Sequence, residues 1–367
     1  MKIGVPKEIL DQEYRIALSP AGVYALKTNG HEIFIENNAG LGSSITNDDF
    51  IKAGAKILNT PEEVFSISDL ILKVKQPLAD ECKFLKPSQI LFTYLHLAAD
   101  KKLALDLCKS KATCIAYETI QLPNGALPLL IPMSEIAGRM SIQIGAHHLE
   151  KYYGGKGILL GGVPGVEPAN VIIIGGGIVG INAARMAVGL GANVVILDNS
   201  VSRLKELDDY FVGRLQTVYS TQHKLDELAQ KADLVVTAVL VTGAKAPKLI
   251  SKATLLKMKP GSVIVDVAID QGGCVEDVKS TKHSEPIMKI NNVCIYAVPN
   301  IPGAVPITST SALTNATLPY VIKIANAGYN AVFEDSALAK GVNVHKGSVV
   351  HNVVANALDM EFTSINA

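Results

Sequence analysis

The chain has 367 residues, of which 48% are hydrophobic and 19% are charged, a composition that can bury a large core and that argues against intrinsic disorder. Its 34 basic and 34 acidic residues give a net charge of +0, so no global field attracts nucleic acid or an anionic membrane. No apolar run approaches the roughly 20 residues of a membrane helix. The N-terminal segment MKIGVPKEIL does not resemble a signal peptide. We therefore expect a cytoplasmic protein without nucleic-acid or membrane partners.

Short apolar runs alternate with helical patterns from the N-terminus onward. We expect strands near Ile3–Val5, Glu32–Ile35, Asp69–Val74, Ile90–Leu95 and Thr113–Tyr117. Helical patterns lie between them, for example over Ala21–Thr28 and Ala98–Ser110. This alternation predicts a mostly parallel sheet with helices on both faces.

A second series of strands follows a long helical pattern at Ser134–Tyr153. Its expected members are Asn170–Ile174, Asn193–Leu197, Leu234–Val239, Ser262–Val267 and Val293–Val298. After Pro299 the pattern is helical again, over Ser311–Ala327 and Ser348–Leu358, without a sheet series of its own. We therefore predict an α/β chain with two doubly wound parallel-sheet domains separated by a cleft. One domain comprises residues 1–128 and 305–367, and the other, residues 129–304, is inserted into it.

The segment VIIIGGGIVGINAARMAVGLGANVVILD carries the clearest motif. An apolar strand runs into Gly175, Gly177 and Gly180, a helix with small residues follows, and an acid ends the next strand. The first glycine permits a tight turn, the second lets the backbone approach a pyrophosphate, and the third allows close packing of helix on strand. The helix N-terminus offers N–H groups and a positive dipole end to phosphates. The combination predicts a Rossmann-like dinucleotide-binding domain.

The acid that ends this motif is Asp198, which should accept hydrogen bonds from both hydroxyls of the adenosine ribose. A carboxylate at this position repels a 2′-phosphate, which favours NAD over NADP as the cofactor. Arg203, a little further along the chain, can relax that preference.

Four polar residues at strand ends are candidates for the chemistry, because ligands of open α/β sheets bind beyond the carboxyl ends of the strands. Arg15 lies in the loop EYRIALSP and can bind a carboxylate with two parallel hydrogen bonds. Lys75 can add a charge, His96 can shuttle a proton, and Asp270 can act as a base or orient water. Each residue taken singly also fits a surface charge or a packed side chain. Together they suit the oxidation of a small amino or hydroxy acid.

Metal ligands and disulfides are not expected. No pair of His, Asp or Glu residues has a recognised zinc spacing, so we predict no metal. The cysteines are odd in number and scattered, which favours free thiols in a reducing cytoplasm.

The segments KIGVPKEI, EYRIALSPAGV, SEIAGRMSIQIGAHHLEK, VIVDVAIDQGG and TSALTNATLPY together resemble alanine dehydrogenase, in the right order and over nearly the whole chain. The chain is also similar to the related transhydrogenase subunit. The resemblance implies reversible, NAD-dependent oxidative deamination of L-alanine to pyruvate and ammonia, by hydride transfer from the substrate Cα to nicotinamide C4. It further implies a homo-hexamer.

The same resemblance assigns roles to individual positions. It implies that Arg15 and Lys75 bind the substrate and that His96 and Asp270 handle protons, with the main base left open between the last two. It places Met133 near the active site. The cofactor contacts that it carries over are Ser134, Asp198, Arg203, Ser220, Leu240, Val241, Ile269, Asp270, Val298, Asn300 and Ile301.

Other functions stay open. A transhydrogenase-type subunit binds NAD without amino-acid chemistry, a saccharopine-type dehydrogenase acts on another substrate, and a regulator with this fold would bind NAD without catalysis. The intact set of Lys75, His96 and Asp270 favours alanine dehydrogenase over the transhydrogenase subunit.

Overall fold

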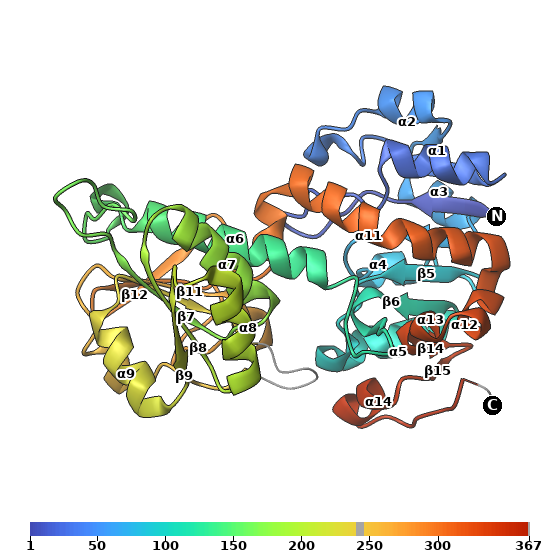
Figure 1. The fold of residues 1–367 in the computed structure, drawn as a ribbon. Helices are drawn as coiled ribbons and strands as arrows, with labels where there is room; N and C mark the ends of the chain where they lie inside the picture. The colour runs from blue at the N-terminus through green and yellow to red at the C-terminus, as the bar shows by residue number, and fades with distance from the viewer. Residues whose placement is uncertain (240–245, 366–367) are drawn as a thin grey trace. The chain divides into compact units, whose positions relative to one another are not determined.

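The computed structural model describes residues 1–239 and 246–365, and the chain forms two compact units. Unit 1 comprises Met1–Met133 and Val305–Ala367, and unit 2 comprises Ser134–Ala304. Unit 2 is therefore inserted into the sequence of unit 1. Both units are α/β with mostly parallel sheets, which confirms the predicted fold class (Figure 1).

The sheet of unit 1 is built from eight strands in the described part of the chain. In spatial order they are β15 (Ser348–Val349), β14 (Val342–His345), β6 (Thr113–Ala116), β5 (Ile90–Thr93), β4 (Leu70–Leu72), β1 (Lys2–Val5), β2 (Glu32–Glu36) and β3 (Lys56–Leu58). The strands from β6 to β3 pair in parallel, and β14 pairs antiparallel to β6. The carboxyl ends of β1, β4, β5 and β6 therefore lie next to one another along one edge.

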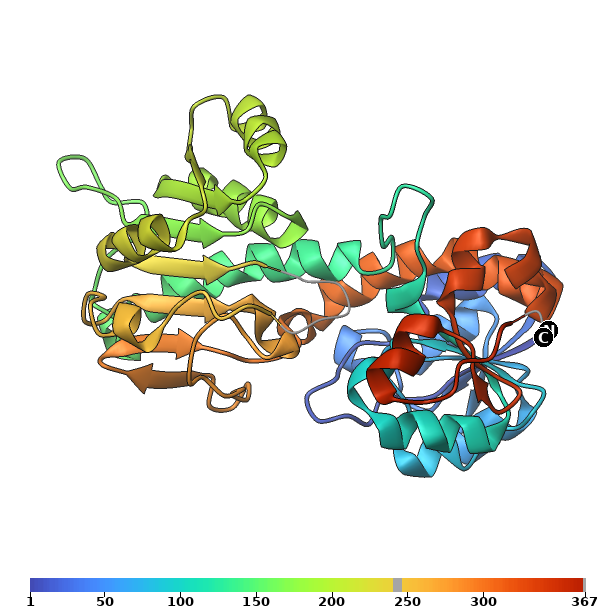
Figure 2. The same cartoon turned by 90° about the horizontal axis from the view of Figure 1, so that it is seen from below.

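Helices cover this sheet on both faces (Figure 2). They are α1 (Pro20–Thr28), α2 (Asn47–Ala53), α3 (Pro61–Ile67), α4 (Ala79–Cys82), α5 (Lys101–Ser110), α11 (Pro306–Ala327), α12 (Ala331–Glu334), α13 (Ser336–Gly341) and α14 (Asn352–Leu358). Their starts are encoded locally. Thr60, for example, caps α3 in a reciprocal capping box with Glu63, and Pro61 occupies the first helical position.

Unit 2 contains a sheet of seven strands among its described residues. In spatial order they are β12 (Ile287–Ile290), β13 (Val293–Tyr296), β11 (Val263–Asp266), β10 (Leu234–Thr237), β7 (Asn170–Ile174), β8 (Asn193–Asp198) and β9 (Gln216–Tyr219). Only β12 is antiparallel to its neighbour. The helices of unit 2 are α6 (Ile131–His148, which begins in unit 1), α7 (Ile178–Gly189), α8 (Val201–Phe211), α9 (Gln222–Lys231) and α10 (Lys252–Leu255).

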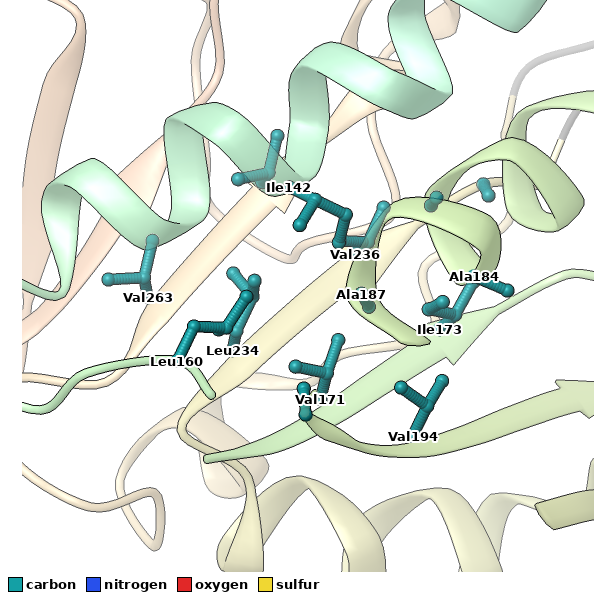
Figure 3. Close-up of a cluster of buried hydrophobic side chains, with 14 of the residues drawn as sticks. Ile142, Leu160, Val171, Ile173, Ala184, Ala187, Val194, Leu234, Val236 and Val263 are labelled. Carbon is teal, nitrogen blue, oxygen red and sulfur yellow. The ribbon is translucent and has the colours of Figure 1, made fainter. Parts of the chain in front are cut away.

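Alternate residues of these strands enter two separate apolar clusters, so both faces of the sheet are buried. Val171 and Ile173 of β7 belong to one cluster, and Ile172 and Ile174 belong to the other. Figure 3 shows the first cluster, where side chains of α6 and α7 pack over the strands. Small residues permit the close approach, since a Cβ added to Gly145 of α6 would lie 2.5 Å from a Leu234 methyl group. The continuous apolar runs in the sequence are explained by this double burial.

The predicted elements differ from the observed ones at the sheet edges. No strands were predicted after Pro299, but β14 and β15 extend the sheet of unit 1 there, and α14 begins only at Asn352. The strands β3, β9 and β12 were also not predicted. Each lies at or next to a sheet edge, where one face or one side stays exposed and the apolar pattern is weak.

All five cysteines are free thiols. Within residues 1–239 and 246–365, no helix combines the length and apolar character that crossing a bilayer requires.

Candidate active site

The parallel order of strands in unit 1 brings three predicted site residues to one edge. Arg15 follows β1, Lys75 follows β4 and His96 follows β5, and these three strands are consecutive neighbours. Because parallel strands end at the same edge, the segments that leave them lie side by side. The sheet itself therefore gathers the candidate residues of unit 1.

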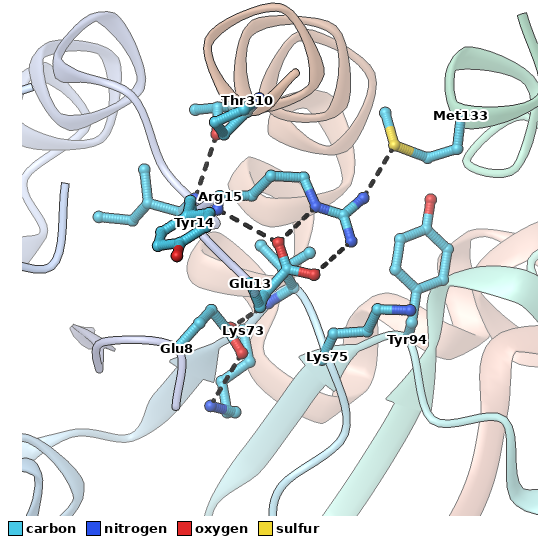
Figure 4. A network of polar contacts seen from close by, with 12 residues as sticks. Glu8, Glu13, Tyr14, Arg15, Lys73, Lys75, Tyr94, Met133 and Thr310 are labelled. Atoms are coloured by element: carbon cyan, nitrogen blue, oxygen red, sulfur yellow. Dashed lines mark hydrogen bonds and ion pairs between the residues drawn. The ribbon is translucent and has the colours of Figure 1, made fainter. Parts of the chain in front are cut away.

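Arg15 is buried and forms a two-pronged ion pair with Glu13 (Figure 4). Its Nε donates to Glu13 Oε1 and its Nη2 to Oε2, both at 2.6 Å, while Nη1 points to the Met133 sulfur at 3.1 Å. Burial would raise the pKa of the Glu13 carboxyl, but hydrogen bonds from Arg15 outweigh it and the pKa is lowered. Glu13 holds the Nε side of the guanidinium, so a carboxylate ligand has to approach Arg15 from the Nη1 and Nη2 side.

Lys75 interacts with its surroundings through its backbone carbonyl group and, near Arg15 and Glu13, through its charge. Its carbonyl oxygen accepts a hydrogen bond from the Thr93 hydroxyl at 2.9 Å, which joins the ends of β4 and β5. Its ammonium group helps to lower the pKa of Glu13. Two cations, Arg15 and Lys75, thus surround one carboxylate, and the positive excess suits a ligand with a single carboxylate.

A second buried ion network links the segments that carry these cations. The Lys73 ammonium lies 2.7 Å from Glu81 Oε1 and 3.3 Å from Glu8 Oε2, with all three side chains almost fully buried. Glu8 also accepts the Val74 N–H at 2.6 Å. Burial raises the pKa of Glu8, and the neighbouring Lys73 only partly opposes this. Because Glu8 follows β1 and Lys73 follows β4, the network fixes one segment against the other.

His96 follows β5 in a conformation that residues with side chains seldom adopt. Its φ is +52° and its ψ is +33°, which is the left-handed region. The imidazole is exposed and lies parallel to the Tyr94 ring, with ring centroids 5.8 Å apart and an interplanar angle of 8°. Tyr94 is itself buried, and its hydroxyl donates to the Leu129 carbonyl oxygen at 2.5 Å. The turn presents an accessible imidazole at the sheet edge, as a proton-transfer group requires.

Replacing Glu13 by glutamine should lower the free energy of unfolding by about 3–5 kcal/mol, because it removes the carboxylate that offsets a buried guanidinium. The matched control is Glu32→Gln in the same unit. Its partner Lys56 is exposed, so this variant should lose little stability, because water screens an exposed ion pair. Urea unfolding of both variants is the measurement. If both variants lost the same unfolding free energy, burial of the Arg15–Glu13 pair would not be the reason for the loss in Glu13→Gln.

The glycine turn of unit 2 lies between β7 and α7. Gly175 has a φ of +101° and its N–H donates to the Leu197 carbonyl oxygen at 2.7 Å. A Cβ on Gly180 would lie 1.9 Å from the Gly175 carbonyl oxygen, so the turn itself excludes a side chain there. A Cβ on Gly177, the residue before α7, would meet nothing within 4 Å. The open space at Gly177, next to the N-terminus of α7, fits a pyrophosphate.

The Asp198 carboxylate is fixed beside this turn, at the end of β8. Its Oδ2 accepts the Gly176 N–H at 2.7 Å and its Oδ1 accepts the Ser200 N–H at 2.8 Å. Arg203 donates from Nε to the Gly176 carbonyl oxygen at 2.7 Å and pairs with Glu206 at 2.6 Å. The Asp198 carboxylate is therefore fixed beside the glycine turn, where it could bind a ribose. The Arg203 guanidinium already binds Gly176 and Glu206 of the same unit.

Asp270 follows β11 and is exposed on a short 3₁₀ turn. The segment that carries it is held by Asp266, the fully buried last residue of β11. The Asp266 carboxylate accepts the Thr237 hydroxyl at 2.6 Å and the Cys274 N–H at 2.9 Å. Burial raises the pKa of Asp266 although these hydrogen bonds oppose the shift. Asp266 thus joins both ends of the Asp270 segment.

The other predicted cofactor contacts lie mostly along the same edge of the unit 2 sheet. Ser220 follows β9, and its N–H donates to the Asp198 carbonyl oxygen at 2.9 Å. The remaining positions are Ile269 beside Asp270, Val298, Asn300 and Ile301 after β13, Ser134 on α6, and Leu240 and Val241, which lie outside the described residues.

Sequence reasoning missed three carboxylates that hold site residues. Glu13 stands two residues before Arg15, and Asp266 is a charge at the end of an apolar run, so the sequence could have indicated both as site residues. No sequence pattern indicates that Glu118 binds the backbone at His96. In the described part of the chain, no group of three or more His, Cys, Asp and Glu side chains is arranged to hold a metal ion.

Comparison with known proteins gives a consistent result. Two models described as the N-terminal and C-terminal domains of Alanine dehydrogenase/PNT match residues 4–137 and 141–352. The chain is 56% identical to the alanine dehydrogenase of Methanococcus maripaludis over 99% of its length and 98% of that protein. It is 53% identical to the alanine dehydrogenase of Mycolicibacterium smegmatis, with the same coverage of both chains. A solved L-alanine dehydrogenase superposes with a TM-score of 0.95 at 50% identity, covering 98% of this chain and 99% of that one.

Proposed function

Because the chain belongs to the alanine dehydrogenase/PNT family, we propose that it catalyses the reversible oxidative deamination of L-alanine to pyruvate and ammonia with NAD. The observation that supports this most directly is the pairing of two features in one chain. Unit 1 carries two cations and an exposed imidazole at the ends of neighbouring parallel strands, and unit 2 carries a glycine turn with open space at Gly177. The first suits a small carboxylate substrate and the second suits a nicotinamide cofactor.

In this proposal the substrate carboxylate binds at Arg15 and Lys75. Glu13 occupies the Nε side of the guanidinium, so the carboxylate meets Arg15 through Nη1 and Nη2. Lys75 adds its point charge to the same carboxylate or polarises the keto oxygen of pyruvate. The Met133 sulfur, 3.1 Å from Arg15 Nη1, lies beside this position.

His96 and Asp270 move the protons in the proposed reaction. A nicotinamide held by the glycine turn and Asp198 would supply the acceptor for the hydride of the substrate Cα, and loss of that hydride would leave an imine. The chain must then bring a water to the resulting imine and return a proton to the leaving ammonia. The imidazole of His96 can donate or accept a proton through its ring nitrogens, and the exposed Asp270 carboxylate can accept a proton or orient that water.

The glycine turn and Asp198 would hold the dinucleotide. Asp198 is already fixed by two backbone N–H groups, and its remaining lone pairs suit the ribose hydroxyls. Arg203 is occupied by Gly176 and Glu206, which weakens it as a partner for a 2′-phosphate. These contacts support NAD rather than NADP.

Asp198→Asn should reduce the preference for NAD over NADP by about tenfold or more, because it removes the like-charge repulsion of a 2′-phosphate while keeping an acceptor for the ribose. The measurement is kcat/KM with each cofactor at saturating L-alanine. Glu206→Gln serves as a control for the general loss of one acidic charge on this side of unit 2. An unchanged ratio in Asp198→Asn would show that the preference has another source.

A spectrophotometric assay of NADH formation tests the function as a whole. L-alanine with NAD should give NADH, and pyruvate with ammonia should consume it. A transhydrogenase-type subunit or an NAD-binding regulator would bind NAD but form no NADH from L-alanine, and a dehydrogenase for another amino acid would prefer that substrate. The homo-hexamer and the cytoplasmic location stay predictions, which sedimentation and cell fractionation can check.

A further inference from the structure

The turn that carries His96 is held in an unfavourable conformation. β5 ends at Thr93, and three residues later His96 adopts a left-handed backbone with φ +52°. For a residue with a Cβ atom this conformation costs roughly 1–2 kcal/mol. Such a geometry persists only where surrounding groups enforce it. The direction in which the imidazole points therefore depends on whatever holds this turn.

Glu118 makes the contacts that hold it. Its Oε1 accepts the His96 N–H at 2.6 Å, and both of its carboxylate oxygens lie 3.2 Å from the Leu95 backbone nitrogen. Hydrogen bonds to an ionised carboxylate are about twice as strong as those between neutral groups. One side chain thus fixes two successive N–H groups of the turn.

The sheet register explains why this side chain reaches the turn. β5 and β6 are parallel neighbours, with Thr93 opposite Ala116. Continuing that register by two residues brings Leu95 level with Glu118, which stands on the 3₁₀ turn Tyr117–Thr119 after β6. From another side, α14 packs against the turn Leu97–Ala99 that follows His96. The histidine turn is thereby clamped between fixed elements of unit 1.

We propose that Glu118 is a positioning residue for His96: its carboxylate holds the left-handed turn and so sets the direction of the imidazole during proton transfer. The inference rests on the proposed function, in which His96 moves a proton. Glu118 has no part in the chemistry itself, because its oxygens bind backbone N–H groups of the turn. A misplacement of about 1 Å in a catalytic group can lower the rate about 100-fold, so loss of the clamp should affect kcat.

The test compares three replacements of Glu118. Glu118→Ala removes both acceptors and should lower kcat for L-alanine about 10- to 100-fold. Glu118→Gln keeps an amide oxygen for the same N–H groups and should restore kcat to within about fivefold of the unchanged enzyme. Glu118→Asp keeps the charge but shortens the side chain, and its kcat should lie between those of the other two variants. The dissociation constant of NADH, followed by fluorescence, should stay the same in all three because the dinucleotide contacts belong to unit 2.

Asp335→Ala is the matched control for a structural role. The Asp335 carboxylate also accepts two successive backbone N–H groups, those of Ala337 and Leu338, at the start of α13. Its removal should lower the melting temperature but leave kcat unchanged. If Glu118→Ala behaves in the same way, with reduced stability and normal kcat, the positioning role is wrong.

A double-mutant comparison with His96→Ala separates the proposal from the function on which it rests. Residues that act through one another have non-additive effects. In the His96→Ala background, Glu118→Ala should change kcat by less than about twofold. A full additional loss there would overturn the inference while leaving the proposed function intact. If Glu118→Ala fails to fold, the Gln and Asp variants carry the same comparison. Absence of any NADH formation by the unchanged protein would refute the proposed function, and the positioning role with it.

Discussion

Replacing His96 by alanine should lower kcat for L-alanine oxidation about 100-fold or more, because a positioned acid–base group contributes roughly this factor. The imidazole is exposed at the edge of the unit 1 sheet, whereas the neighbouring Tyr94 is buried and donates its hydroxyl to a backbone carbonyl. Burial also raises the pKa of Tyr94, which makes it a poor substitute for proton transfer near neutral pH. Steady-state formation of NADH is the measurement.

His147→Ala provides the control for this variant. His147 is exposed at the C-terminal end of α6 in unit 2, where it lies 3.6 Å from Glu150 and follows no strand end that carries a candidate residue. Its replacement should leave kcat, KM and NADH binding unchanged. Near-normal turnover in His96→Ala would remove His96 from the reaction and leave Asp270 as the acid–base candidate.

Replacing Gly177 by alanine should weaken NADH binding roughly 10- to 100-fold without lowering the melting temperature, since overpacking a fitted contact costs about 1–3 kcal/mol. A Cβ at this position meets nothing within 4 Å in the protein, and the backbone φ of −68° accepts any residue. The new methyl group would instead occupy the space that we propose for the pyrophosphate. Fluorescence titration with NADH, together with thermal unfolding, separates the two effects.

Two other glycines of the same region serve as comparisons. Gly189, the last residue of α7, is exposed and also has open space around an added Cβ. Gly189→Ala should therefore preserve NADH binding and raise stability by about 0.5–1 kcal/mol. Gly180→Ala should lose stability and binding together, because its Cβ would collide with the Gly175 carbonyl oxygen. If Gly177→Ala lost stability as Gly180→Ala does, the glycine at 177 would serve packing within the chain rather than a ligand.

The central strands of both sheets could be predicted because they are buried on both faces. Strands such as β7 read as unbroken apolar runs, and β7 was predicted with the observed bounds. The strands at or near the edges could not be predicted in the same way. β9 is exposed or half-buried along its length, and β15 has only two residues, so neither leaves a pattern that differs from a loop.

The site could be predicted as residue types but not as contacts. A charge that ends an apolar run marks a strand end, which is how Lys75, His96 and Asp270 were found. The carboxylate that supports His96 acts at a distance that only folding creates. Glu118 meets His96 because β5 and β6 pair in one particular register, and no spacing in the sequence encodes that register.

The insertion of unit 2 has a consequence for the order in which the chain is completed during synthesis. The hydrogen bond between Thr113 and His345 closes a loop of 232 residues, and all of unit 2 is translated before β14 exists. Domains fold as units as they emerge from the ribosome. Unit 2 is therefore complete while β6 still lacks its neighbour β14. A chain that stops before Val342 keeps β6 as an open edge of buried-type residues. Such an edge pairs readily with strands of other chains, so truncation near the C-terminus should cause aggregation rather than a shorter, working enzyme.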